Sequence, residues 1–396
     1  MSSAEYDVVV VGAGLAGLQC ARLLAARGLR VLLADAKEKV DRGVHTTGIF
    51  VRRTLEDFAL PEDCLGPPVR DVVLYSPAGR ALPLASAQDE FRVGKMGALY
   101  RRWLDDAVAA GVEWMPSTRY AGMEADGAGS RIALERAGVR RWVRARFVVG
   151  ADGATSRVAR GLGLDENREW IVGVEDVFRG APGDGAPCFH CWLTPELAPG
   201  YIAWVVSDGE EMHVGVGGHA SHFRPTDALR RFRAQVAARF GLEGRTVDDR
   251  RGGRIPVGGV LRRIAQPRGL LAGDAAGAVS PLTAGGLDPC LRLSALAARV
   301  AEDFLSTGDP AALAPYDGAR FRAHFRTRIA LRRALSGVRS PLLLEAACAA
   351  LRSPLLRPLA SGIFFGRGSF PDVEPRVDIR GSSASNALHP HPTPTA

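Results

Sequence analysis

The chain has 396 residues, enough for the buried cores of two or three domains. Its hydrophobic content of 46% and charged content of 24% are those of an ordinary globular protein, and no apolar run reaches the length that spans a bilayer. The formal net charge of +8 comes from arginines spread along the chain, which excludes the basic, aromatic-interleaved block of a nucleic-acid interface.

The first part of the chain has the pattern of a dinucleotide-binding unit. Residues 6–11 form an apolar run with the length of a buried strand, and residues 18–27 are rich in helix-forming alanine and leucine. A glycine turn separates the two, and its candidate cofactor-binding residues are Gly12, Gly14, Leu15, Ala16 and Gly17. In such a turn the first glycine allows a tight bend, the second lets the backbone approach a pyrophosphate, and the third lets helix pack on strand. The helix N-terminus would then offer free N–H groups to the phosphates.

A second predicted strand, residues 29–34, delivers an acid to the same edge of the sheet. This acid, Asp35, follows the glycines by about 20 residues, the position from which a carboxylate holds ribose hydroxyls. The strand, turn, helix, second strand and acid follow one another at the spacing of a dinucleotide-binding unit. A chance glycine turn in another kind of α/β unit is therefore the weaker interpretation. The elements expected next are a helix over residues 52–58, a hairpin joining 72–75 to 80–84, a helix over 99–110, a strand over 112–115 and an antiparallel pair formed by 131–135 and 141–149.

Two later segments again place a glycine and an acid after a strand. The strands are expected over residues 147–150 and 270–272, and the candidate cofactor-binding residues behind them are Asp152, Gly153, Gly273 and Asp274. Ligands gather outside the carboxyl ends of parallel strands, where Asp274 can accept hydrogen bonds from ribityl hydroxyls. The loop that follows would wrap a flavin ring and aim helix N–H groups at its pyrimidine edge, with candidate residues Pro281, Gly285, Gly286 and Leu287. Together the three segments predict an FAD site that is built from three separate stretches of the same chain.

The part of the chain between the second and third segments predicts a substrate-binding sheet. Residues 165–223 are mostly strand, with expected strands over 171–178, 188–193, 201–206 and 212–216, and a helix should follow over 225–240. After residue 310 the chain should be helical. The apolar, arginine-studded stretch over 341–365 is either a packed cap on the core or a surface that faces lipid.

The predicted fold class is α/β: a discontinuous Rossmann-like FAD-binding domain with an inserted antiparallel substrate domain and a helical C-terminal region. The expected divisions are FAD-binding parts over 1–70, 98–164 and 255–309, substrate-domain parts over 71–97 and 165–254, C-terminal helices over 310–366, and a disordered tail over 367–396. The six cysteines show no disulfide framework, and no signal peptide is evident, so we expect a cytoplasmic protein for which peripheral membrane contact stays open. The Cys188–Cys191 pair would supply too few ligands for zinc, and we expect no metal.

The three segments resemble one family of FAD enzymes. Gly-Ala-Asp-Gly-x-x-Ser beginning at Gly150, and Gly-Asp-Ala-Ala-Gly-x-x-x-Pro-x-x-x-Gly-Gly beginning at Gly273, are similar to motifs of the para-hydroxybenzoate hydroxylase superfamily. The stretch over 101–105 is similar to the family's Arg-x-x-Phe-Asp, whose arginine contacts FAD. The resemblance therefore implies Arg101 as a cofactor-binding residue, with Arg42 as a weaker match.

Within that superfamily the chain looks most like the geranylgeranyl reductase branch. Residues 199–204 followed by 214–217 are similar to the branch's Tyr-x-Trp-x-Phe-Pro element and the glycines after it, but here an extra residue is present and the proline is missing. The branch usually carries a Cys-Gly pair in the loop after the ribose acid, where this chain has His-Thr-Thr-Gly. Both departures fall where substrate should meet flavin. The candidate catalytic residue is His45, whose ordinary pKa lies near neutrality, and the candidate pocket residues are Thr47 and Trp204.

The resemblance implies an FAD-dependent oxidoreductase that uses NAD(P)H to reduce a C=C bond in an apolar, isoprenoid-like small molecule. The chain has one dinucleotide fingerprint and no second one, so the nicotinamide would dock transiently. The alternative is a single-component FAD monooxygenase that hydroxylates an aromatic or polyketide-like substrate. A third possibility is an FAD-bound protein with a redox-neutral role. We expect no nucleic-acid partner and infer no obligate protein partner.

Overall fold

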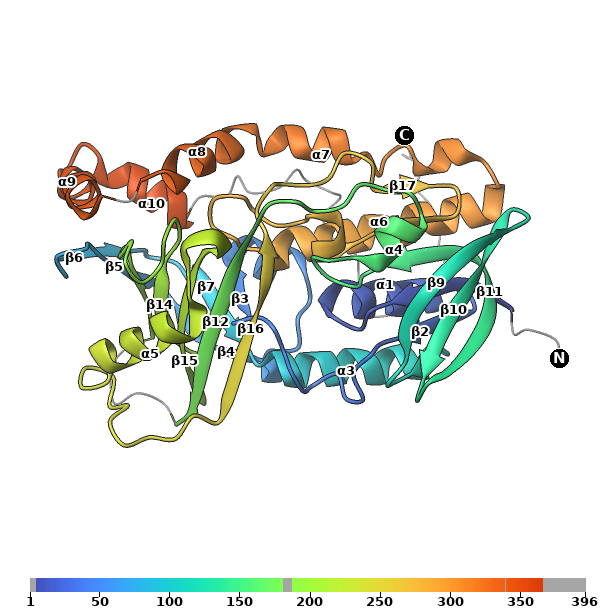
Figure 1. Ribbon diagram of the computed structural model, residues 1–396, viewed down its shortest axis with the longest axis horizontal. Coiled ribbons are helices and arrows are strands. Elements are labelled where there is room, and N and C mark those ends of the chain that lie inside the picture. Colours follow the sequence, from blue (N-terminus) through green and yellow to red (C-terminus); the bar gives the residue numbers. More distant parts are fainter. Residues whose placement is uncertain (1–4, 181–186, 339, 366–396) are drawn as a thin grey trace, which may run out of the picture.

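The computed structural model describes residues 5–180, 187–338 and 340–365 (Figure 1). The turn expected at 182–185 and the tail expected over 367–396 lie outside the described residues.

The centre of the molecule is a mostly parallel sheet. Among the described residues it has eight strands, with β17-β18-β11-β1-β2-β8 as the main order and β10 and β9 added beside β11. Its strands are β1 (Glu5–Val11), β2 (Val31–Ala34), β8 (Glu113–Met115), β9 (Arg119–Asp126), β10 (Gly129–Arg136), β11 (Val139–Gly150), β17 (Ala265–Gln266) and β18 (Gly269–Leu271). The apolar runs of β1 and β2 are buried because helices cover the sheet, as in other parallel sheets.

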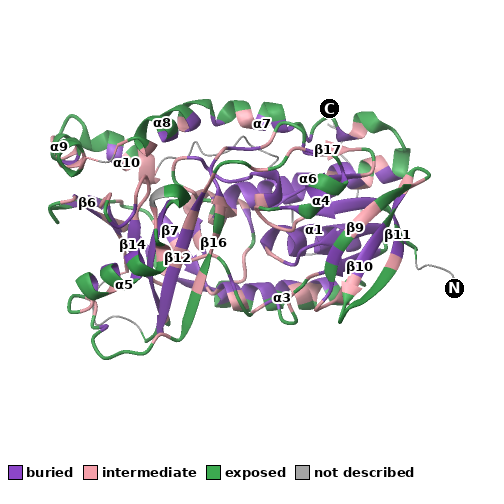
Figure 2. Ribbon diagram, viewed as in Figure 1, coloured by how far each residue is buried: buried purple, intermediate pink, exposed green. Residues whose placement is uncertain are grey.

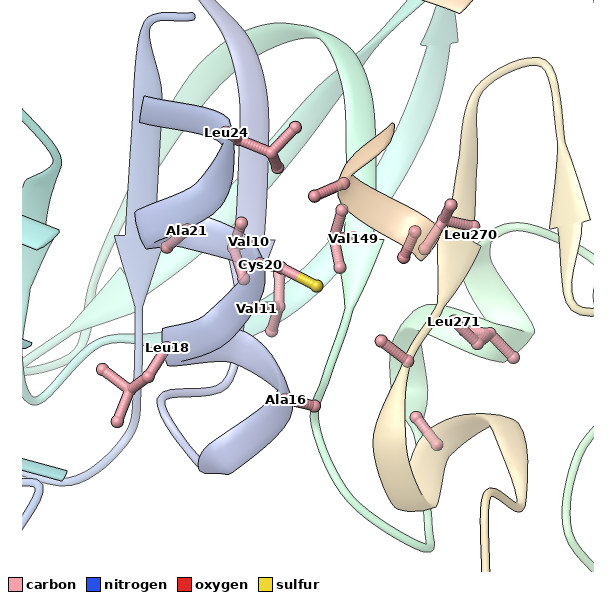
Figure 3. Packing of buried hydrophobic residues seen from close by; sticks show 14 of the residues in the cluster. Val10, Val11, Ala16, Leu18, Cys20, Ala21, Leu24, Val149, Leu270 and Leu271 are labelled. Carbon is pink, nitrogen blue, oxygen red and sulfur yellow. The ribbon is translucent and has the colours of Figure 1, made fainter. Parts of the chain in front are cut away.

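Helix α1 (Leu15–Ala25) is enclosed by this sheet and by helices α3 (Met96–Ala109) and α6 (Leu287–Thr307). Every residue of α1 is buried, which explains why its sequence is apolar apart from Gln19 and Arg22, which hydrogen-bond to each other at 2.8 Å. Figure 3 shows Ala16 and Cys20 of α1 packed beside Val11 and Val149, so the first and second predicted segments share one core. The remaining helices of the first three hundred residues are α2 (Arg52–Asp57), α4 (Arg157–Gly161) and α5 (Pro225–Val236).

The predicted substrate sheet is present and has seven strands within the described ranges, in the order β16-β12-β15-β14-β13-β5-β6. Its strands are β5 (Asp71–Tyr75), β6 (Ala81–Ala85), β12 (Trp170–Arg179), β13 (Cys188–Trp192), β14 (Ala203–Ser207), β15 (Glu211–His219) and β16 (Asp249–Pro256). Its pairings are antiparallel except that of β13 with β5, which is parallel. Helix α5 covers one face, where Phe232 packs with Val214 and Val216 in a second apolar core.

Several local expectations are corrected by the structure. The helix expected near Ala154 begins at Arg157, and the one expected to reach residue 240 ends at Val236. A small sheet of β3 (Ile49–Val51), β7 (Phe91–Gly94) and β4 (Leu65–Val69), in that order, and strand β9 were not expected. Two prolines in β4 and the shortness of β3 hide the small sheet from pattern reading.

The C-terminal region is helical, as expected. It comprises α7 (Gly318–His324), α8 (Arg326–Ser336), α9 (Pro341–Leu351) and α10 (Arg357–Phe365). Figure 1 shows α9 and α10 at one end of the long axis beside hairpin β5–β6, with hairpin β9–β10 at the opposite end. No helix in the described part of the chain is both long enough and apolar enough to cross a membrane.

Candidate active site

The three glycine segments meet at the carboxyl edge of the parallel sheet. Val11 pairs with Ala34 of β2 and with Gly150 of β11, and Gly150 pairs in turn with Leu271 of β18. A methyl group placed on Gly12 would overlap the carbonyl oxygen of Ala151. The segments therefore touch one another, and the contact leaves no room for a side chain on the first glycine.

The N-terminus of α1 is open toward the same edge. Gly14 is its N-cap, with no side-chain hydrogen bond to the helix and no acid in the first turn. A methyl group on Gly14 would meet no atom within 4 Å, whereas one on Gly17 would overlap the carbonyl oxygen of Gly12. Free space in front of uncapped N–H groups suits a pyrophosphate, because the N–H groups and the helix dipole both favour an anion there. Leu15 and Ala16 begin the helix, and the N–H of Leu15 is directed at the hydroxyl of Tyr100.

Asp35 lies beside the glycine turn. Its Oδ2 accepts a hydrogen bond from the backbone N–H of Ala13 at 2.6 Å, and its Oδ1 accepts one from the N–H of Lys37 at 2.7 Å. These bonds fix the carboxylate at the end of β2. Each oxygen keeps further acceptor capacity that a ribose hydroxyl could use.

Asp274 and the start of α6 form the other end of the site. Within the described residues no hydrogen bond reaches the carboxylate of Asp274, and burial raises its pKa to about 6. A methyl group on Gly286, the N-cap of α6, would lie 3.7 Å from Oδ1 of Asp274, and no side chain caps this helix either. The loop between them, which includes Pro281 and Gly285, holds Ala284 at a φ of 52°, a left-handed conformation that is uncommon for alanine.

These residues fit FAD. Asp274 is a desolvated acceptor to which the described residues supply no donor, as a group placed to receive ribityl hydroxyls would be, and helix α1 presents an uncapped N-terminus to open space. The N-terminus of α6, at Leu287, offers a second set of N–H groups beside Asp274. The site thus has carboxylate acceptors for hydroxyls and helix N–H donors for anionic or carbonyl oxygens.

Two of the predicted cofactor residues, Asp152 and Arg101, have other partners in the structure. The carboxylate of Asp152 accepts hydrogen bonds from Ser156 Oγ at 2.5 Å and from the N–H of Arg157 at 2.7 Å, so it organises the start of α4. Gly153, at a φ of 81°, makes the turn between strand and helix. Arg101 forms an ion pair with Asp41, while the neighbouring Arg42 is exposed.

On the face of the substrate sheet opposite α5, the indole ring of Trp204 packs over Gly215 and Gly217, which we call the glycine floor. A methyl group on Gly215 would overlap the indole ring, and one on Gly217 would lie 3.6 Å from it and 2.6 Å from the ring of Tyr201. The indole N–H is buried and has no acceptor in the described chain. Tyr201 in turn donates to the carbonyl oxygen of Thr283 at 2.7 Å, which ties this sheet to the loop before α6.

His45 and Thr47 connect the loop after β2 to the same sheet. Nδ1 of His45 lies 2.9 Å from the carbonyl oxygen of Gly252, and the ring itself is exposed. Partial desolvation and the charge of Lys37 lower the pKa of His45 from its ordinary value of 6.5. Thr47 donates a hydrogen bond to Oε2 of Glu175 at 2.5 Å.

Glu175 belongs to a buried charged pair that the sequence analysis missed. Its Oε1 lies 3.4 Å from Nδ1 of His213 and 3.9 Å from Arg251, and both Glu175 and His213 are almost fully buried. Burial alone would lower the pKa of His213, but the carboxylates of Glu175 and Asp208 raise it to about 9. Burial would raise the pKa of Glu175, yet the charge of His213 and the hydrogen bond from Thr47 bring it below the ordinary value. The available signal was the pair of consecutive acids at 175 and 176 inside an apolar strand, which must point to opposite faces.

None of the six cysteines is exposed or bonded to another. Burial raises the pKa of the thiol at Cys20, Cys64, Cys188, Cys191, Cys290 and Cys348. The Cys188–Cys191 pair lies on strand β13, as expected.

Comparison with known proteins assigns the fold and the family. The FAD binding domain family matches residues 98–324, and the lycopene cyclase protein family matches residues 7–179. The digeranylgeranylglycerophospholipid reductase of Methanothrix thermoacetophila is 30% identical over 325 residues, which cover 76% of this chain and 79% of that protein. The protein of the same name from Methanosarcina acetivorans is 30% identical over 323 residues, 77% of each chain.

Among solved structures, a geranylgeranyl bacteriochlorophyll reductase-like protein from Thermoplasma acidophilum superposes with a TM-score of 0.79 at 21% identity, covering 93% of this chain and 98% of that one. The p-nitrophenol 4-monooxygenase of Pseudomonas putida superposes with a TM-score of 0.64 at 20% identity, covering 94% and 95%. These likenesses confirm the predicted fold. With the glycine segments in contact and the reductases as relatives, the chain belongs to the FAD binding domain family and is an FAD-dependent oxidoreductase of its geranylgeranyl reductase branch.

Proposed function

We propose that this enzyme saturates carbon–carbon double bonds in the isoprenoid chain of a lipid, with NAD(P)H as the source of electrons. The observation that carries the proposal is the apolar surface that adjoins Trp204, because an isoprenoid has no polar group along its chain to recognise. The names of the relatives in Methanothrix and Methanosarcina support the same substrate class.

This apolar surface is continuous from Trp204 to helix α10. Ile49, Phe189 and Ile202 pack both in the cluster around Trp204 and in the cluster that contains Phe365 of α10. All three are only partly buried, so they keep apolar area that a ligand could cover. We call the side chains of Ile49, Phe189, Ile202, Phe364 and Phe365 the apolar wall.

The residues at the inner end of the wall have distinct tasks. FAD, when bound, supplies the hydride equivalent that saturation of a double bond requires. The glycine floor lets the indole of Trp204 lie flat, so that an alkene can pack against a rigid, apolar face. Thr47, held by Glu175, presents its oxygen lone pairs rather than its proton to the site, because the proton points to the carboxylate.

Saturation also needs a proton, and we assign it to His45. Since Nδ1 faces the carbonyl oxygen of Gly252, Nδ1 carries a hydrogen and Nε2 is the nitrogen that exchanges a proton. His45 acts as an acid only below its lowered pKa, so the rate should fall as pH rises, with an apparent pKa below 6.5. The variant His45→Gln should flatten that limb of the rate profile. An unchanged profile in the variant would assign the proton to another donor.

Product mass tests the function itself. The FAD-loaded enzyme is given a lipid with geranylgeranyl chains and NADPH, with and without air. Products heavier by pairs of hydrogens, formed without air, are expected. A product heavier by one oxygen and formed only in air would identify a hydroxylase, and failure of NADPH and NADH alike to reduce the flavin would overturn the proposed electron source.

A further inference from the structure

The end of the molecule formed by α9 and α10 exposes an unusual amount of apolar side chain. Seven of the nine large hydrophobic residues that are exposed in the described chain lie between residues 331 and 359. The exposed fraction is 81% for Leu342, 90% for Leu355 and 60% for Leu359. Figure 2 shows the contrast with α1 and α6, which are buried along most of their length. Clustered exposed leucines on a folded protein mark a surface that contacts something apolar.

The C-terminal helices α8, α9 and α10 and the residues between them carry a net positive charge. Residues 326–365 contain seven arginines and one acid, which is a net charge of +6 out of the +8 of the whole chain. The single acid, Glu345, accepts a hydrogen bond from the N–H of Ala78 at 3.0 Å and lies 3.8 Å from Arg80, so it is engaged with the hairpin β5–β6. On α8, Arg332 is buried and Arg333 pairs with Glu169 at 3.5 Å, whereas Arg357 of α10 is exposed close to the leucines. Leucines next to an exposed arginine suit a partner that is apolar inside and anionic at its surface.

The inner side of this region is packed, which separates it from the exposed side. Cys348 of α9 and Ala360 of α10 are buried, and the ring of Phe365 lies 6.0 Å from that of Phe91. The packed cap, one of the two interpretations of residues 341–365, therefore describes the inner side of these helices, while their outer side is exposed. We call the exposed side chains of Leu342, Leu343, Leu355, Leu356 and Leu359 the leucine face.

We propose that the leucine face docks on an anionic lipid bilayer and that a membrane-resident substrate reaches Trp204 along the apolar wall. The first half of this inference stands on exposure and charge, and the second half rests on the proposed function. Helices α9 and α10 have 11 and 9 residues, too short to span a bilayer, so the leucines would enter only the interfacial layer while arginines contact lipid phosphates. The wall continues inward from this point, because Phe364 and Phe365 belong to α10 itself.

Binding to vesicles tests the docking without any need for turnover. The full FAD-loaded chain is floated with vesicles of phosphatidylglycerol and phosphatidylcholine, and with vesicles of phosphatidylcholine alone. The expected result is flotation with the anionic vesicles that weakens as salt is raised. The double variant Leu355→Glu/Leu359→Glu should reduce the partition coefficient at least tenfold.

A matched control is available at the far end of the molecule. Val139, exposed to 70% on β11, stands beside the exposed Arg140 and Arg141 but far from the leucine face, so Val139→Glu should float like the wild type. Flavin absorbance and circular dichroism establish that each variant is folded. Equal loss in both variants, or no binding of the wild type to anionic vesicles, would overturn the proposal. So would a wild-type dimer that the double variant dissociates, because the leucine face would then meet a second copy of the chain.

Activity measurements distinguish a failure of the docking proposal from a failure of the proposed function. The double variant should lose activity toward a digeranylgeranyl lipid embedded in vesicles while it keeps activity toward a short, water-soluble isoprenoid alkene. If neither variant nor wild type reduces any isoprenoid but the wild type still floats, the proposed function fails and the docking stands. Equal activity of double variant and wild type on the embedded lipid would overturn the substrate route.

Discussion

Each face of the substrate sheet contains a buried acid, and the two acids have different partners. Glu175 and Asp176 are neighbours on β12 and therefore point to opposite faces. On the α5 face, Asp176 is held by Arg250 at 2.7 Å and Arg233 at 3.1 Å, both of which reach solvent. On the opposite face, which carries Trp204, Glu175 is held by Thr47 and by the buried His213.

The different composition of the two faces indicates that one face mainly stabilises the fold and the other mainly serves the reaction. The α5 face is filled with valine, methionine and phenylalanine, and its acid is locked by arginines that stay charged at any pH. The opposite face is floored by glycine, carries Trp204, and neutralises its acid with a histidine, a group that can lose its charge. Changes on the first face should therefore affect unfolding, and changes on the second should affect turnover and pH response.

The largest effect should follow from a side chain on the glycine floor. Gly215→Val would push into the indole of Trp204 and displace it, and we expect kcat/KM to fall about 100-fold, since a small misplacement in a site costs that much. Val214→Ala, next in sequence but on the α5 face, should lose about 2 kcal/mol of stability and keep its activity. Steady-state kinetics and urea unfolding of both variants measure these two effects. If Gly215→Val and Val214→Ala had similar kcat/KM values, the two faces would not differ in their contribution to turnover.

The second effect is a loss of stability at alkaline pH. The folded protein binds the His213 proton more tightly than the unfolded chain does, because the pKa is raised from 6.5 to about 9. This contribution is fully present below pH 6.5 and is lost as pH rises through 9, by up to about 3 kcal/mol. Urea unfolding at pH 6, 7, 8 and 9 should show the decline. His213→Gln should remove most of the slope, and an unaltered slope would assign it to other groups.

A smaller change should come from the acid on the α5 face. Asp176→Ala leaves Arg233 and Arg250 without their carboxylate, but both can turn to water, so we expect a loss of about 2 kcal/mol rather than the larger cost of an orphaned buried charge. The denaturation midpoint measures it. The kinetic constants should stay those of the wild type, in contrast with Gly215→Val. A change of KM would show that the two faces communicate.

The smallest effect is expected at Thr47. Thr47→Val keeps the size of the side chain but removes the donor to Glu175, which still has His213 and Arg251, so stability should fall by about 1 kcal/mol. Thr47→Ser keeps the hydroxyl and should behave like the wild type in the same unfolding experiment. A Ser variant as unstable as the Val variant would indicate that the methyl group, and not the hydrogen bond, matters.

The sequence predicted which glycine segments and acids meet at the edge of the parallel sheet, but it did not predict the side-chain pairs of the substrate sheet, for a physical reason. The glycine turn, Asp35 and Asp274 act through local backbone geometry at strand ends, and a strand end is visible in the order of residues. The pairing of Glu175 with His213 joins positions 38 residues apart, and only the register of β12 with β15 brings them together. Neither the partners of Asp152 nor the bond between Thr47 and Glu175 could be read from spacing, because both depend on loop conformation.

The state of the cysteines has a consequence for how the enzyme survives oxidants. A thiol reacts with peroxide or alkylating agents as its thiolate, and burial raises the pKa of all six thiols here. Where the reductase branch usually has a cysteine in the loop after the ribose acid, this chain has Thr47, which holds no sulfur to oxidise. Where a reduced flavin reacts with dioxygen and releases hydrogen peroxide, the raised pKa of these thiols keeps them protonated and slows their oxidation.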